Sequence, residues 1–248
     1  MSPKALRVFV TLFSFLILFV TPAAAQSLSL DLGAPGGGTT ARIIQLIALM
    51  TILSLAPGIL VMVTSFTRLV VVLSLLRAAL GAQQTPPNMV LVSLALFLTA
   101  FIMAPTFEKA YDDGIAPLMA EKIDETTAFE RTAAPFRDFM LSQVREKDLG
   151  LFMDMAKIEE VATPAETPLK ALVPAFMISE LRRAFEIGFL VFLPFLIIDM
   201  VVASVLMSMG MMMLPPVMIA LPFKLIFFVM VDGWYLVAGS LVRSFGGV

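Results

Sequence analysis

Apolar residues fill two long parts of the chain, and the first part extends from residue 43 to residue 107. Its two longest stretches, Ile43–Val63 and Met89–Pro105, each approach the roughly 20 residues that a helix needs to cross a bilayer. The polar break Gln83-Gln-Thr-Pro-Pro87 lies between them. We therefore predict a first apolar helical hairpin in residues 43–107.

Two arginines, Arg68 and Arg77, lie between these stretches in a segment that is otherwise apolar. Residues 66–80 contain no helix breaker, so the pattern predicts that they continue the helix. The N-terminus has the pattern of a cleavable secretory signal peptide, which would leave the mature N-terminus outside the cytoplasm. Both arginines then fall on the cytoplasmic side, in agreement with the excess of positive charge in cytoplasmic loops. Hydropathy does not show whether this segment contacts lipid, headgroups or other protein.

The second apolar part contains the stretches Ile187–Leu206 and Val217–Leu236, each long enough for a span. The segment MSMGMMMLPP, residues 207–216, joins them. Pro215 and Pro216 lack amide donors and disfavour a helical conformation in the residue before them, so a helix cannot run straight through. We predict a second apolar helical hairpin in residues 187–248, and hence an all-α membrane protein.

A polar part separates the two hairpins. Residues 108–186 hold most of the acidic residues and more than half of the basic residues. Apolar residues recur there at helical spacing, as in Phe136, Phe139, Met140 and Val144, which indicates amphipathic helices. The acidic excess, and the position after a helix that leads out of the cytoplasm, predict a helical region on the periplasmic side.

The N-terminus has the three parts of a secretory signal peptide. Lys4 and Arg7 precede an apolar run, residues 8–20, and Pro22-Ala-Ala-Ala25 provides small residues for cleavage after Ala25. The alternative is an uncleaved first membrane helix, but the run is shorter than a span requires. We predict a cleavable signal peptide in residues 1–25 and a flexible, glycine-rich linker in residues 26–42.

The composition agrees with a membrane protein and excludes several functions. Hydrophobic residues make up 59% of the chain, charged residues 15%, and the mean hydropathy is +0.96. A net charge of −2 without a basic stripe argues against a nucleic-acid partner. The chain has no cysteine and no histidine, which removes thiolate nucleophiles and the commonest metal ligands. It also lacks a glycine-rich phosphate loop. We expect no cofactor, no metal and no enzymatic activity.

Three charged residues, Asp199, Lys224 and Asp232, lie inside the second apolar part. A charge at membrane depth costs about 2.5 to 3.5 kcal/mol on insertion scales, so each is expected to face protein or water and to have a partner. Glu180 and Glu186 are further candidate partners for Lys224, within the chain or between chains. An intramembrane enzyme is the alternative, with Asp199 and Asp232 as its paired carboxylates.

The methionines of residues 207–216 admit two chemistries. Methionine sulfur is a soft ligand for Cu(I), which would suit a copper transporter. Methionine is also a conformable apolar side chain that repacks around its neighbours, and it can serve simply to fill a core. The single cluster and the absence of histidine and cysteine favour the apolar role.

Several motifs carry a family resemblance. They are Ser54-Leu-Ala-Pro-Gly-Ile-Leu60, Ser65-Phe-Thr-Arg-Leu69, Gln83-Gln-Thr-Pro-Pro-Asn88, Pro174-Ala-Phe-Met-Ile-Ser-Glu-Leu181, Phe192-Leu-Pro-Phe-Leu-Ile-Ile-Asp199, residues 207–216, Leu221-Pro-Phe-Lys-Leu225 and Val231-Asp-Gly-Trp234. These blocks resemble the signatures of the FliP family of flagellar biosynthesis proteins, over residues 43–107 and 168–245. Within the wider type III secretion family, the leader and the methionine segment favour the flagellar branch over the virulence injectisome.

The resemblance implies a subunit of the export gate of the bacterial flagellum. Such proteins form a homo-oligomer, suggested to be a pentamer, with FliQ and FliR at the flagellar basal body in the inner membrane. The gate works with FlhA and FlhB and passes unfolded flagellar subunits. In the known architecture the apolar helices form a cone largely lifted out of the bilayer.

The resemblance also implies roles for residues of this chain. Met211, Met212 and Met213 would form a gasket that closes the pore, and Gly210 would give the backbone freedom to point them inward. Met207 and Met209 are either further pore residues or packing. Glu180 is the first expected partner of Lys224 across the subunit boundary.

Overall fold

A computed structural model describes residues 39–82, 84–158, 163, 166–211 and 215–246. The predicted signal peptide, with its cleavage site at Ala25, and most of the predicted linker lie outside these residues. The chain divides into two compact units, residues 1–53 and 54–248. Helix α2 (Thr39–Val63) crosses the division, and its N-terminal part is all that is described of the first unit.

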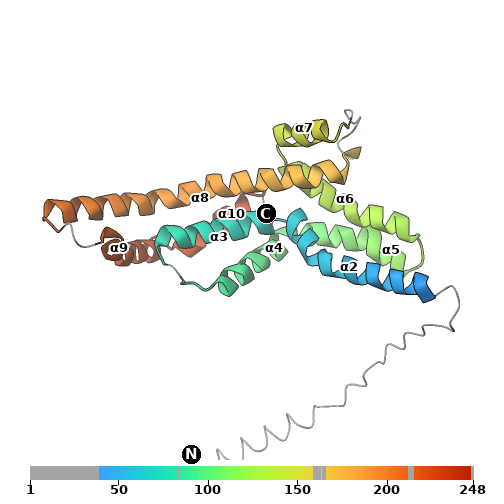
Figure 1. The fold of residues 1–248 in the computed structure, drawn as a ribbon, viewed down its shortest axis with the longest axis horizontal. Helices are drawn as coiled ribbons and strands as arrows, with labels where there is room; N and C mark the ends of the chain where they lie inside the picture. The colour runs from blue at the N-terminus through green and yellow to red at the C-terminus, as the bar shows by residue number, and fades with distance from the viewer. Residues whose placement is uncertain (1–38, 83, 159–162, 164–165, 212–214, 247–248) are drawn as a thin grey trace, which may run out of the picture. The chain divides into compact units, whose positions relative to one another are not determined.

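The described part of the second unit is helical after α2, which confirms the all-α fold (Figure 1). Its elements are α3 (Phe66–Leu80), α4 (Asn88–Ala110), the π-helix η1 (Tyr111–Ile115), α5 (Ala116–Met119), α6 (Glu125–Gln143), α7 (Glu146–Met155), α8 (Leu169–Ser208), α9 (Pro216–Met230) and α10 (Gly233–Arg243).

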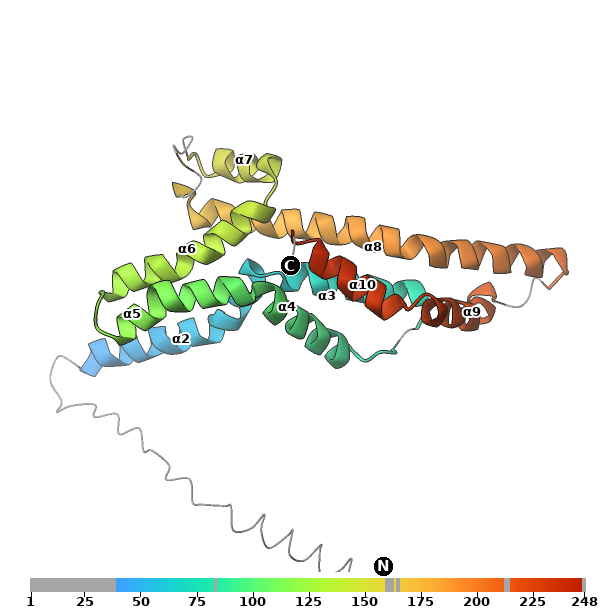
Figure 2. The same ribbon diagram turned by 180° about the vertical axis from the view of Figure 1, so that it is seen from behind.

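Helix α3 forms the core of the second unit. It lies beside α8 in both views (Figures 1 and 2). Leu69 and Val72 are fully buried and belong to a cluster with Ala95 of α4 and Ala184 of α8. The two helices approach closely at Gly188, where a Cβ atom would lie 2.2 Å from Leu75 Cδ1. The segment whose surroundings hydropathy left open is therefore packed against protein.

The polar part folds as amphipathic helices, as the spacing predicts. Phe136, Phe139 and Met140 lie on α6, and Met140 packs with Leu172 and Phe176 of α8. The rings of Phe139 and Phe176 meet edge to face, with centroids 5.9 Å apart. This contact attaches the polar helices to the start of α8.

Helix α8 is the longest element, with 40 residues. At 1.5 Å per residue it extends about 60 Å, roughly twice the thickness of the hydrocarbon core of a bilayer. It begins at Leu169 and passes without a break through residues 186–187, where the change in charge predicts a boundary. The polar part and the second apolar part therefore share one continuous helix.

Two helical segments of the described chain are long and apolar enough to cross a membrane, Asn88–Met119 and Leu169–Ser208. Two bent helix pairs add to these if each pair is one span: Leu46–Leu55 with Pro57–Val63, and Pro216–Met230 with Gly233–Arg243. The second pair bends by 64°. The predicted apolar limb of residues 217–236 is thus two helices, with Asp232 in the left-handed region at φ +51° between them.

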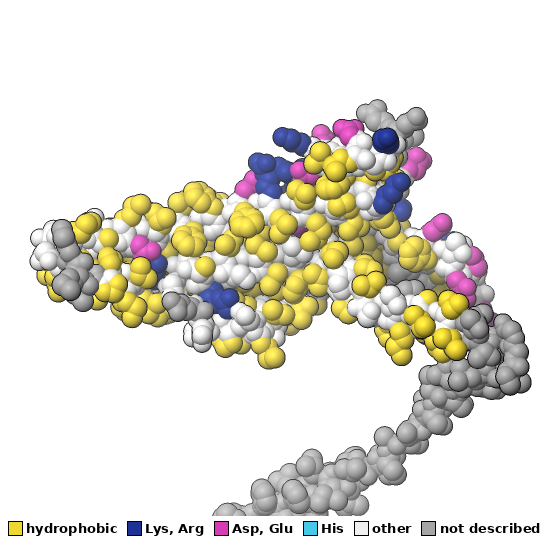
Figure 3. All heavy atoms as spheres, viewed as in Figure 1, with side chains coloured by type: hydrophobic (Ala, Val, Ile, Leu, Met, Phe, Trp, Pro, Cys, Tyr) yellow, Lys and Arg dark blue, Asp and Glu magenta, His cyan; other side chains and the backbone are white. Residues whose placement is uncertain are grey.

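The surface of the second unit divides into a charged and an apolar area. Figure 3 shows that charged side chains gather around α7 and the start of α8, whereas hydrophobic side chains cover most of the visible face of α8 beyond them. Large apolar side chains on that length of the helix are exposed, among them Phe185, Phe189, Leu190, Ile197, Met200 and Val201. This surface needs lipid or other protein chains to cover it.

Candidate functional site

The methionine segment begins as the turn that ends α8. The amide of Met211 donates to the carbonyl of Leu206 at 3.0 Å, and the amide of Gly210 donates to Met207 at 3.1 Å. Gly210 has φ +72°, a conformation that glycine adopts without steric cost. A six-residue bond around a left-handed glycine is the Schellman end of a helix. Gly210 therefore stops α8 and redirects the chain.

The methionines on the described side of this turn are exposed. Met207, Met209 and Met211 expose 56%, 66% and 41% of their surface. Met212 and Met213 lie outside the described residues. Helix α9 begins at Pro216, since proline is well suited to the first turn of a helix but not to its interior. The turn thus presents thioether side chains at one end of the α8–α9 hairpin.

Lys224 of α9 forms hydrogen bonds to α3 and α8. Its side chain is 4% exposed, and its ammonium donates to Asp199 Oδ2 of α8 at 2.7 Å and to the carbonyl of Ala79 at 3.0 Å. Ala79 lies in the last turn of α3, where unpaired carbonyls attract a cation. The buried charge expected at Lys224 has a partner within the same chain, Asp199.

Glu180 contacts Arg68 and not Lys224 in the described chain. The side chains of Arg68 and Glu180 are fully buried. Arg68 Nε donates to Glu180 Oε2 at 2.9 Å, and Arg68 Nη2 forms a second, short bond to Glu180 Oε1. This bidentate pairing matches the planar guanidinium to the carboxylate. Within the chain, Glu180 is therefore paired with Arg68 of the neighbouring helix α3, and its pairing with Lys224 across a subunit boundary stays a prediction.

The Arg68 guanidinium has further partners from other elements. Its Nη2 donates to Gln143 Oε1 of α6 at 3.1 Å, and its Nη1 donates to the carbonyl and the hydroxyl of Ser244, both at 3.0 Å. The ring of Phe245 covers it, with Cζ 3.6 Å from the ring centroid. We call Arg68, Glu180, Gln143, Ser244 and Phe245 the arginine cluster. It joins α3, α6, α8 and the residues after α10.

The other two predicted charges are exposed. Glu186 pairs with Arg182 on the same helix at 2.8 Å, with 58% and 56% of the side chains exposed, so it is a surface pair. Asp232 is exposed at the α9–α10 bend, and the described residues offer it no ion pair. Among the described residues no three histidine, cysteine, aspartate or glutamate side chains gather as a metal site.

Asp148 forms a smaller buried polar group at the start of α7. The hydroxyl of Ser179 on α8 donates to Asp148 Oδ2 at 2.6 Å, and Arg145 Nε donates to the same oxygen at 2.8 Å. Burial alone would raise the pKa of Asp148, but the bonds from Ser179 and Arg145 outweigh it and lower the pKa below its ordinary value. This group attaches α7 to α8.

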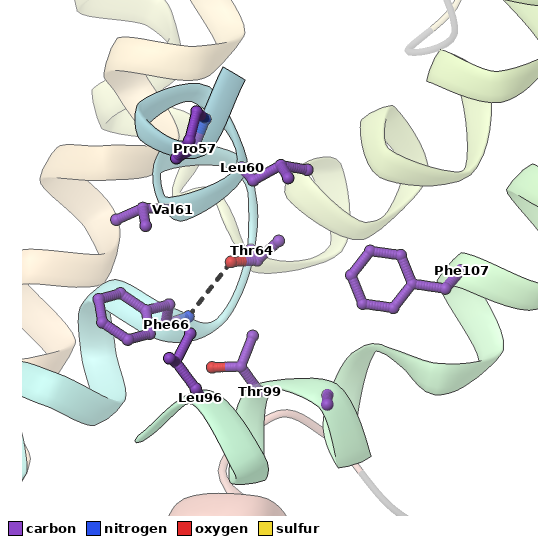
Figure 4. A pocket seen from close by; sticks show the side chains of 9 residues that line it. Pro57, Leu60, Val61, Thr64, Phe66, Leu96, Thr99 and Phe107 are labelled. Atoms are coloured by element: carbon purple, nitrogen blue, oxygen red, sulfur yellow. Dashed lines mark hydrogen bonds between the residues drawn. The ribbon is translucent and has the colours of Figure 1, made fainter. Parts of the chain in front are cut away.

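Apolar hollows open on the surface of the second unit. One, of about 320 Å³, lies between the C-terminal end of α2 and α4 and is lined by Leu60, Val61, Leu96 and Phe107 (Figure 4). Its polar groups are hydroxyls, including Thr64, which accepts a hydrogen bond from the amide of Phe66 at 3.5 Å. This hollow is lined mainly by apolar side chains and can hold an apolar group.

The ion pairs could be found only in part from the sequence. Arg68 and Glu180 each lie in a conspicuous motif, but they are 112 residues apart, and no local pattern joins them. The signal was the charge of Arg68 within an apolar run, which requires a partner. Gln143, Ser244 and Phe245 gave no such signal, because each is an ordinary residue at its position.

Comparison with known proteins relates most of the chain to one protein family. The FliP family matches residues 49–241. The flagellar biosynthetic protein FliP of Caulobacter vibrioides is 64% identical over 229 residues, covering 91% of this chain and 86% of that protein. The protein of the same name from Bacillus subtilis is 56% identical over 202 residues, 82% of this chain and 91% of that protein.

A third relative is less similar in sequence but matches over nearly the same share of this chain. The FliP protein of Pectobacterium carotovorum is 50% identical over 232 residues, which are 92% of this chain and 90% of that protein. Matches of this identity over nearly the full length of each chain establish common ancestry and fold. The chain therefore belongs to the FliP family.

Proposed function

We propose that this chain is the core, channel-forming subunit of the flagellar export gate, through which unfolded flagellar subunits cross the inner membrane. Membership in the FliP family supports a role in flagellar export and assembly, and the long apolar helices support a membrane location. The FliP family is not known as a family of enzymes. The proposed role is that of a channel and includes no catalytic step.

The observation that carries the proposal is the exposed apolar surface along α8 and α9. Phe189 and Leu190 of α8 expose 64% and 63% of their surface, and Met218 of α9 exposes 71%. Soluble monomers rarely expose so much contiguous apolar surface. Association of several copies around an axis would cover it, as would contact with the small partner subunits FliQ and FliR.

The hydrogen bonding of Asp199 supports the presence of neighbouring chains at the same surface. Asp199 Oδ2 accepts the bond from Lys224, whereas Oδ1 is inaccessible to solvent and has no hydrogen-bond partner among the described residues. A carboxylate oxygen without a donor is costly in an apolar setting. A donor from an adjacent subunit would satisfy it, which agrees with a homo-oligomer, suggested by the family to be a pentamer.

The turn that begins the methionine segment, residues 207–211, is called the methionine turn. It supports the proposal of a seal at one end of this oligomer. A channel wide enough for an unfolded polypeptide leaks ions when it is empty, unless an apolar constriction excludes water. Methionine has three rotatable side-chain bonds, so it can close a gap and then repack around a passing chain. A ring of turns, each carrying Met211, Met212 and Met213 after the left-handed Gly210, would provide such a constriction.

The placement of the remaining parts follows from the same proposal. The acidic helices α6 and α7 would lie on the periplasmic side at the flagellar basal body, and α8 would extend from them toward the channel axis. FlhA and FlhB would deliver substrates from the cytoplasmic side. The length of α8, about 60 Å, allows it to carry the turn well away from the polar helices.

Copurification tests the assembly. The full chain, tagged and expressed from its native locus, should migrate on a native gel as a complex of several copies that contains FliQ and FliR. Cells that lack the chain should be non-motile and should retain rod and hook subunits in the cytoplasm. A chain that migrates as a monomer and copurifies with neither partner would contradict the proposal.

A further inference from the structure

We propose that Ser244 and Phe245 act as a strap that docks α10 onto α3 and α6 by completing the contacts of the buried Arg68 guanidinium. The strap is a conformational device of the single chain, so the inference does not depend on the proposed function.

The strap supplies the acceptors of Arg68 Nη1 and covers the face of the guanidinium. The carbonyl and hydroxyl of Ser244 accept both bonds of Nη1 at 3.0 Å. The Phe245 ring covers the guanidinium and stacks on Phe139 of α6, with ring centroids 6.1 Å apart. Gln143 Nε2 donates to the carbonyl of Phe245 at 3.4 Å. Two successive residues therefore contact α3 and α6 at once.

Helix α10 also packs through one apolar face. Of its eleven residues, Gly233 and Leu241 are buried, and Val237, Ala238 and Val242 are partly buried against the core of α3, α4 and α8. Trp234 and Tyr235 expose 41% and 71% of their surface. This apolar face holds α10 against its neighbours by burial alone. The strap, one turn beyond Leu241, adds a polar attachment at the end of α10 that lies farther from α9.

The other end of α10 is a bend. Helices α9 and α10 meet at 64°, and Asp232 between them has φ +51°, a strained conformation for a residue with a side chain. A helix with a bend at one end and a strap at the other can move as a unit. Release of the strap would leave Nη1 of Arg68 without acceptors, so the docked position is strongly favoured.

Thiol labelling measures docking directly, because the chain has no cysteine. In the full chain, Leu241→Cys places a thiol at a position that is 1% exposed and reports contact of α10 with its neighbours. Adding Phe245→Leu removes the cation–π contact and should raise the rate of maleimide labelling about tenfold. Phe245→Tyr keeps the ring and should leave the rate within about twofold.

Two comparisons make the result specific. Phe129→Leu, the same change at an α6 position that is 69% exposed, should not alter labelling of Leu241→Cys. In a chain with Arg68→Met and Glu180→Leu, which removes both buried charges, Phe245→Leu should lose most of its effect. Unchanged labelling with Phe245→Leu, or an equal increase in the charge-free chain, would overturn the proposal.

Hydrogen exchange covers the case in which Leu241→Cys does not fold. In the cysteine-free chain, Phe245→Leu should speed amide exchange in residues 233–243 more than in α4, since only α10 loses its attachment. Equal acceleration in both helices would show general destabilisation, and it would overturn the strap as a device specific to α10.

Discussion

The arginine cluster and the methionine turn lie on opposite halves of α8 and differ in what surrounds them. Glu180, near the start of the helix, is fully buried and paired with Arg68 inside the chain. Met207 and Met209, at the other end, are more than half exposed. The same helix is thus fixed to its own chain at one end and presents free apolar surface at the other.

This contrast indicates that one part of the second unit is stable within the single chain, whereas another part needs lipid or other chains to cover it. The arginine cluster satisfies its charged groups with partners from four parts of one chain, so it can form before any assembly. The surface around Asp199 and the turn is complete only when lipid or other chains cover it. The proposed gate subunit would need both properties, because a rigid base would have to hold conformable methionine side chains in a shared constriction.

The largest effect is expected from breaking the buried pair. Glu180→Gln keeps the shape of the side chain but leaves the Arg68 charge without compensation, and it should cost about 3 to 5 kcal/mol of unfolding free energy. Glu186→Gln makes the same change in the exposed pair and should cost at most about 1 kcal/mol. Thermal unfolding of the purified protein in detergent compares them. Equal losses would show that the arginine cluster is no more important than a surface contact.

A smaller loss of stability, with a larger effect on assembly, is expected at Lys224. Lys224→Met removes the bonds to Asp199 and to the carbonyl of Ala79, for a loss of about 1.5 to 3 kcal/mol. The exchange of both residues, Lys224→Asp with Asp199→Lys, should restore part of the complex on a native gel. If compensating changes at Asp199, Glu180, Glu186 and Asp232 all fail to restore it, the ion pair does not explain the role of Lys224.

The same substitution, glycine to alanine, should change the free energy of unfolding in opposite directions at two positions. Gly210→Ala forces a side chain into the left-handed conformation and should destabilise the end of α8 by about 1 to 2 kcal/mol. Gly150→Ala, in the helical interior of α7 where a Cβ meets nothing within 4 Å, should stabilise by about 0.5 to 1 kcal/mol. Chemical denaturation in detergent measures both. A stabilising Gly210→Ala would contradict the turn geometry described here.

The smallest effect concerns acid stability. The pKa of Asp148 is lowered in the folded chain, so its carboxylate contributes stability above the unfolded pKa of about 3.9. That contribution is lost as the pH falls through the lower folded pKa. Asp148→Asn should therefore be less stable at pH 7, and its melting temperature should fall less steeply between pH 5 and pH 2. Parallel curves for both proteins would refute this reading.

Much of the fold could be predicted from hydropathy and helix breakers. The apolar stretches, the amphipathic spacing around Phe139 and the interruption of the helix before Pro216 all follow from local rules. The continuity of α8 across residues 186–187 did not follow, because a change in charge marks a change of surroundings and not the end of a helix. Hydropathy also cannot separate contact with lipid from contact with protein, so the burial of α3 was left open.

The site was predictable to a different degree. Gly210 was expected to free the backbone, and its left-handed conformation agrees with that expectation. The sequence offered Asp199, Glu180, Glu186 and Asp232 as candidate partners of Lys224, and within the chain Lys224 pairs with Asp199. This pairing depends on which helix faces which, and that is a property of packing between residues far apart in the sequence. The pairing of Lys224 with Glu180 across a subunit boundary stays a prediction.

Ion conductance of the assembled gate reports on the proposed methionine seal. The complete gate, purified with its partner subunits and placed in a planar bilayer, should be nearly closed when no substrate is present. Replacing Met211, Met212 and Met213 with alanine should raise the conductance of the idle complex while assembly on a native gel stays the same, because the constriction loses its apolar filling. Unchanged conductance in a fully assembled complex would contradict the methionine seal.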